Sequence, residues 1–268
     1  MFFSTLIVVL IPRQQIQAIV LATTDPTSEL WDSDYMASVY SNDSPEVITP
    51  ETIACKILKF YHRSRKWATY AQDPTKRNQK FSLEFIHAAQ SILRDIDSWD
   101  SQIPLDWRCA EPDVVRLALS QDHDTAASSR VAASFLSLIR ACEVCFYSSA
   151  IGIFTMVDSG MNVEGDGTDL LSDIVQKMQL RVQAVIKNIC GNVHRVLESN
   201  DEPGVLQQGH AAGAYHVLWP LWAVINCPFA SVDQVDKCRE TLGQIGSTLG
   251  FNLAFLLQEA SFPLGLQK

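Results

Sequence analysis

Apolar residues recur at three- and four-residue steps through most of the chain after residue 50, and this period restricts the fold more than any other feature. In Phe81 to Trp99 the apolar side chains fall on one stripe of a helix, while Glu84 and Arg94 fall elsewhere. No stretch combines the alternating pattern of strands with hairpin glycines. The sequence therefore predicts an all-α fold, a bundle-like or orthogonal arrangement of roughly eight to ten helices.

The same period predicts the positions of the other long helices. We expect them at 51–70, 128–157, 170–197, 215–225 and 232–249. With 268 residues, of which 47% are hydrophobic, the chain can bury one full-sized core. We therefore predict an N-terminal apolar segment and polar connector over 1–50, and one helical domain over 51–268.

Capping residues and prolines predict where several of these helices begin and end. Thr168 or Asp169 can cap the helix over 170–197, and Ser231 has capping-box spacing ahead of the last clear helix. Gly250 can end that helix, because glycine adopts the left-handed conformation without strain. Pro220 lies inside 215–225 and should kink or restart the helix there.

The N-terminal segment is apolar in two short stretches, 1–11 and 16–22. Neither reaches the roughly 20 apolar residues of a membrane span. The first lacks a basic flank, which disfavours a secretory signal without excluding one. We expect no association with membranes.

Charge argues against general binding of nucleic acids, because the chain has a net charge of -9. One local exception is the stretch 56–80, which has eight basic residues against Asp73 alone and is interleaved with aromatic residues. It supplies a candidate basic surface: Arg63, Arg65, Lys66, Lys76 and Arg77. The pattern fits nucleic-acid contact, but it fits better a solvated helical face with its aromatic side chains turned inward.

Metal and redox chemistry find little support in the sequence. Seven scattered cysteines indicate reduced thiols rather than a disulfide framework. Cys142 and Cys145 form a C-x-x-C pair, but no second pair completes a zinc site, so we interpret both as small core residues. The carboxylates around Trp99 could bind magnesium, yet they fit a solvated helix face better; they are Asp95, Asp97 and Asp100. We predict neither a metal nor a cofactor.

Catalytic motifs are also missing from the sequence. It holds no G-x-S-x-G elbow, no P-loop and no G-x-G-x-x-G. Asp122, His123 and Asp124 could form an acid–base cluster, but we interpret them as a polar loop ahead of the helix over 128–157. We therefore name no catalytic residue.

One short region carries a resemblance to a known family. Trp219, Pro220 and Leu221, followed by Pro228 and Phe229, lie ahead of a helix that ends in Leu-Gly. This pattern resembles the C-terminal part of the fungal-specific transcription factor domain, the helical regulatory region of fungal binuclear zinc-cluster regulators. A second match lies upstream, and its residues are Ile92, Leu93, Ile96, Trp99, Ile103, Pro104 and Trp107. Together the matches extend over about residues 53–258.

The resemblance implies a nuclear, non-enzymatic regulator in fungal secondary metabolism, with the cytoplasm as the alternative location. It would act through a partner protein or a small apolar effector, and it could form a homodimer. The six clustered cysteines of the DNA-reading module are not in the sequence, so we expect no autonomous DNA binding. The chain could derive from a truncated gene model, from a regulator that acts through partners, or from a duplicated domain.

Two other functions remain open: a helical enzyme recruited to isomerise or cyclise an apolar metabolite, and a purely structural dimerisation module. The candidate pocket or motif residues are Trp219, Pro220, Leu221, Trp222 and Phe229. Core packing is the simpler role for the two tryptophans, and a small cavity beside the proline is the functional alternative.

Overall fold

The computed structural model describes residues 52–54, 56–57, 59–61, 63–64, 79–103, 123–158, 167–197 and 211–259. These residues are helical apart from short turns and include no strand, which confirms the all-α prediction for this part of the chain. The contacts divide the chain into two compact units. The first comprises 1–102, 155–162 and 263–268, and the second comprises 103–154 and 163–262. The predicted segment 1–50 lies outside the described residues.

The first unit contains α4 (Gln79–Gln102) and the helical residues between Thr52 and Ser64. The ring centroids of Phe60 and Phe85 lie 5.3 Å apart, and Lys56 forms a 2.6 Å ion pair with Asp95 of α4. Five residues of the amphipathic stripe of α4 are buried as predicted, and they are Phe85, Ala89, Ile92, Ile96 and Trp99. Ala88, which belongs to the same predicted stripe, is half-buried. The helix ends just before Ile103 and Pro104, because proline disfavours helical geometry in the residue ahead of it.

The longest helix, α6 (His123–Asp158), begins earlier than predicted. His123 and Asp124 lie in its first turn, so the polar-loop interpretation is wrong for these two residues. Polar side chains commonly occupy first helical turns, where unpaired backbone N–H groups meet water. Residues 133–156 are long and apolar enough to cross a membrane, but 83% of this window is buried inside the protein, as in the core helix of a folded domain.

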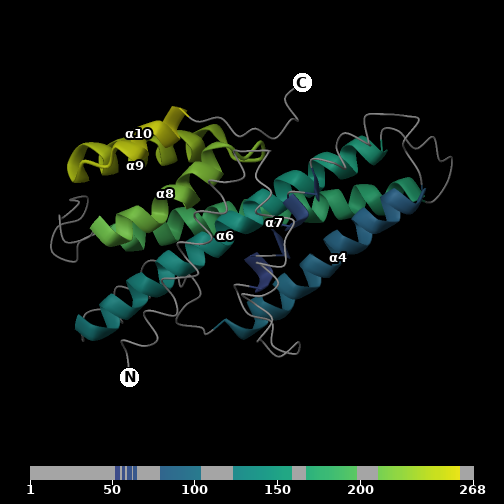
Figure 1. Ribbon diagram of the computed structural model, residues 1–268, viewed down its shortest axis with the longest axis horizontal. Coiled ribbons are helices and arrows are strands. Elements are labelled where there is room, and N and C mark those ends of the chain that lie inside the picture. The colour runs from purple at the N-terminus through teal and green to yellow at the C-terminus, as the bar shows by residue number, and fades with distance from the viewer. Residues whose placement is uncertain are drawn as a thin grey trace. The chain divides into compact units, whose positions relative to one another are not determined.

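Four further helices belong to the second unit: α7 (Gly167–Leu197), α8 (Ala211–Ile225), α9 (Val232–Leu249) and α10 (Asn252–Glu259). α8 packs against α7, α9 and α10, and α10 packs along α9 (Figure 1). α7 starts at Gly167, so Thr168 and Asp169 lie inside its first turn instead of capping it. α10 was not predicted from the sequence.

The ends of α9 match the prediction. The Ser231 side chain accepts a hydrogen bond from the backbone N–H of Gln234, and the Gln234 side chain accepts one from the backbone N–H of Ser231. This reciprocal capping box gives hydrogen-bond partners to two backbone N–H groups that have none within the helix. At the other end Gly250 adopts φ 72°, and its N–H donates to the carbonyl of Gly246. A residue with a Cβ would be strained at this φ.

Candidate functional site

Of the residues that carry the family resemblance, Trp219, Pro220 and Leu221 lie on α8, and Pro228 and Phe229 lie on the loop that joins it to α9. The upstream match begins on α4. α8 is apolar on every side, which is typical of a helix enclosed by neighbours. Val217 and Val224 are fully buried, and Trp219, Leu221 and Trp222 are 5%, 2% and 4% exposed. The structure therefore places this part of the motif in the core of the second unit.

The two tryptophans contact each other. Their ring centroids lie 5.1 Å apart with an interplanar angle of 83°, the edge-to-face geometry that aromatic quadrupoles favour. Pro220 follows Trp219 in the sequence and is buried, and α8 continues through it without restarting. The surrounding core holds the helix together here, although proline cannot donate the usual backbone hydrogen bond.

The loop after α8 is fixed by hydrogen bonds at both ends. Asn226 donates to the Trp222 carbonyl oxygen from its backbone N–H, at 3.1 Å, and from its side-chain amide, at 2.9 Å. Gln183 of α7 donates from its side chain to the carbonyl oxygen of Phe229. Pro228 is exposed and Phe229 is half-buried, so this loop is the part of the motif that reaches solvent.

α7 and α8 approach each other closely near the start of α8. A Cβ added to Gly213 of α8 would lie 2.9 Å from Cγ1 of Val196 on α7. Glycine therefore allows the two helices to approach more closely than alanine would. This contact and the Gln183 hydrogen bond join α7 to both ends of the α8 segment.

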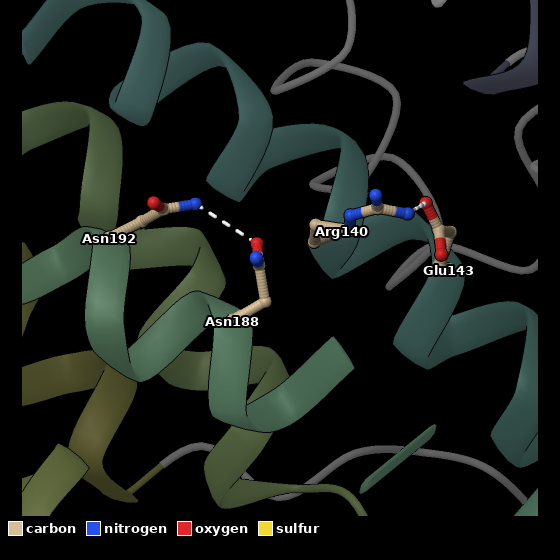
Figure 2. Close-up of polar contacts among 4 residues, drawn as sticks. All are labelled: Arg140, Glu143, Asn188 and Asn192. Atoms are coloured by element: carbon tan, nitrogen blue, oxygen red, sulfur yellow. Dashed lines mark hydrogen bonds and ion pairs between the residues drawn. The ribbon is translucent and has the colours of Figure 1, made fainter. Parts of the chain in front are cut away.

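Two partly buried polar pairs of the second unit were not predicted (Figure 2). On α6, the Arg140 guanidinium lies 2.5 Å from the carboxylate of Glu143, and these side chains are 12% and 1% exposed. On α7, the side-chain amide of Asn192 donates to the Asn188 side-chain oxygen at 3.0 Å. The sequence offered a signal for the first pair, because Arg140 and Glu143 are the only charged residues between 131 and 157.

The candidate basic surface is only partly described. Arg63 is exposed on the N-terminal helical segment, and Arg65, Lys66, Lys76 and Arg77 lie outside the described residues. Phe60 and Tyr61 are buried in the same segment, as the solvated-face interpretation expects. Lys56 is already paired with Asp95, so part of the positive charge is neutralised within the chain.

Both cysteines of the C-x-x-C motif lie on α6. Cys142 is buried in α6, and Cys145 interacts with Cys227, which follows α8. Burial raises the pKa of Cys145 to about 12 and also raises that of Cys227, whose sulfur lies 3.5 Å from the Ser148 hydroxyl. Thiols in such surroundings stay protonated and behave as small apolar groups.

No group of three or more histidine, cysteine or acidic residues within the described ranges could hold a metal ion. Of the three carboxylates around Trp99, Asp95 pairs with Lys56 and Asp97 is exposed.

Comparisons with protein-family models, with curated proteins and with solved structures found no match.

Proposed function

We propose that this chain is a helical regulatory domain of fungal transcription-regulator type, acting in the nucleus through a partner protein or a small apolar effector. One observation supports the proposal most. The residues of the C-terminal match, which extend over 219–250 in the sequence, lie on α8, its loop and α9, and these two helices pack against each other. Trp219, Leu221 and Trp222 are buried in the core of this unit, as a regulatory scaffold requires.

The packing of α8 suits it to pass on a signal. α8 contacts α7, α9 and α10, so a ligand or partner that displaces it must displace these helices as well. Close-packed interiors transmit such strain, because they contain few voids to absorb it. The Pro228–Phe229 loop gives the buried motif a surface that a partner or effector can reach.

The proposal is tested by tethering the full chain to an unrelated DNA-binding domain upstream of a reporter gene in a fungal host. We expect reporter output to change at least threefold relative to the DNA-binding domain alone. Trp222→Ala, which empties the buried indole site, should abolish the change, whereas Val232→Ser should retain it because Val232 is 73% exposed. Immunoblots must show equal protein levels. An unchanged reporter at full expression would contradict the proposal.

Two further measurements separate the alternatives. A fluorescent fusion of the full chain should collect in the nucleus, and exclusion from it would argue against a transcriptional role. Incubation of the purified chain with extracts of fungal apolar metabolites should leave them unchanged. Isomerised or cyclised products would support the enzyme interpretation instead.

A further inference from the structure

Most of α7 has a charge opposite to that of the chain as a whole. The stretch 174–197 contains no aspartate or glutamate, whereas its basic residues are Lys177, Arg181, Lys187 and Arg195. The whole chain carries a net charge of -9. Lys177 and Lys187 are exposed, so this helix presents positive charge to solvent on a molecule that is acidic overall.

Apolar side chains lie between the two exposed lysines. Leu180 is 68% exposed, and Ala184 is exposed as well. Lys177, Leu180, Ala184 and Lys187 follow one another at helical steps of three or four residues, so they lie on one face of α7. The opposite face, which includes Ile186, is buried. α7 therefore presents outward a short apolar strip with a cation at each end.

The loop between α8 and α9 adds to this exposed face. The side chain of Gln183, which is exposed on α7, donates a hydrogen bond to the carbonyl oxygen of Phe229. This bond holds the loop beside the outer side of α7, where Pro228 is exposed and Phe229 is half-buried. We call the combined area the α7–loop surface, and its residues are Lys177, Leu180, Ala184, Lys187, Pro228 and Phe229.

We propose that the α7–loop surface docks an acidic peptide segment of a partner protein, in which carboxylates flank leucine or aromatic side chains. The apolar side chains of the segment cover Leu180 and Ala184, and its carboxylates pair with Lys177 and Lys187. The inference rests on the proposed function, because it gives a chemical class to the partner through which the regulatory domain acts.

Charge and exposure favour this occupant over two others. A second copy related by a two-fold axis would bring the lysines of one surface towards those of the other, and like charges repel. Nucleic acid would pair its phosphates with the lysines, but phosphates cannot cover the exposed Leu180. An acidic peptide with apolar side chains complements both the cations and the strip between them.

Fluorescence anisotropy tests the proposal with the purified full chain. The probe is a fluorescein-labelled synthetic peptide in which aspartate alternates with leucine and tryptophan. We expect saturable binding with a Kd below about 100 μM, and weaker binding at about 0.5 M sodium chloride, because salt screens exposed charges. The same peptide with lysine in place of aspartate should not bind.

Two double variants with the same change in net charge locate the contribution of the lysines. Lys177→Glu/Lys187→Glu should weaken peptide binding by about tenfold or more, because each replacement opposes a carboxylate of the peptide. Lys59→Glu/Lys237→Glu should leave binding unchanged, since these two exposed lysines lie outside the α7–loop surface.

A second matched pair tests the apolar strip. Leu180→Ser should weaken peptide binding by about threefold or more, whereas Leu256→Ser on α10 should not change it. The two leucines are 68% and 64% exposed, so both variants should keep the wild-type circular dichroism spectrum.

The proposal is overturned if the acidic peptide does not bind or if both double variants bind it equally. It is also overturned if the lysines of the α7–loop surface instead support self-association, or binding to duplex DNA or to phosphatidylserine vesicles. A chain that changes reporter output without binding the peptide would remove this inference alone. A chain that binds the peptide but leaves the reporter unchanged would contradict the proposed function and retain the docking surface.

Discussion

Replacing Arg140 with methionine removes a positive partner of the Glu143 carboxylate, whose side chain is 1% exposed. Methionine keeps most of the apolar stem of arginine, so the change in the free energy of unfolding comes mainly from the lost charge. Breaking a buried ion pair by removing one member costs about 3–5 kcal/mol, because the remaining charge stays desolvated. Since whole domains are stable by about 5–15 kcal/mol, Arg140→Met should lose a large share of the folding free energy.

Asp236 and Arg239 of α9 provide a matched control with the same three-residue spacing. Their charged groups lie 3.8 Å apart, with side chains 66% and 52% exposed. Exposed pairs contribute about 0–1 kcal/mol, so Arg239→Met should change stability little. The double variant Arg140→Met/Glu143→Leu should recover most of the loss, because an apolar pair of similar volume replaces both charges.

Urea unfolding followed by circular dichroism at 222 nm measures all of these variants. The reasoning predicts a large loss for Arg140→Met, a small one for Arg239→Met, and recovery in the double variant. If Arg140→Met lost no more than Arg239→Met, the Glu143 carboxylate would not depend on Arg140, and the argument from burial would fail.

Three smaller predictions test other parts of the second unit. Ser231→Ala removes the capping box of α9 and should cost about 0.5–2 kcal/mol in the same urea assay; an unchanged midpoint would refute the cap's contribution. A Cβ at Gly246 would lie 2.7 Å from the Phe255 ring, so Gly246→Ala should be better tolerated, by about 1 kcal/mol, in a Phe255→Ala background. Equal effects in both backgrounds would exclude the clash. The pKa of Cys145 is raised to about 12, so the folded state keeps this proton while the unfolded chain releases it above about pH 9. Stability should therefore fall as pH rises between these values, and less steeply in Cys145→Ala, as thermal melts at pH 8 and 10.5 would measure.

Local chemistry explains which elements could be predicted from the sequence. The bounds of α9 followed from Ser231 and Gly250, because both act through neighbouring backbone groups. α10 escaped prediction because it has only eight residues and apolar side chains on both faces. Ala254 and Leu257 are buried, but Phe255 and Leu256 are exposed, so the helix depends on packing against α9 rather than on its own pattern.

The same distinction between local chemistry and packing between helices applies to the residues of the candidate site. The tryptophan motif was visible because its residues are close in sequence, although only the structure places both indoles in contact. The hydrogen bond from Gln183 to the Phe229 carbonyl could not be predicted, since it depends on how α7 packs beside the loop that follows α8. The C-x-x-C spacing of Cys142 and Cys145 drew attention to metal or redox chemistry, but Cys142 is buried and burial raises the pKa of Cys145 to about 12.

The tethered reporter tests the central claim most directly, because it measures regulatory activity without requiring the natural target or partner. The account predicts at least a threefold change with the full chain and a loss of that change when Trp222 is replaced by alanine. Reporter output equal to that of the DNA-binding domain alone, from a folded and fully expressed fusion, would contradict it.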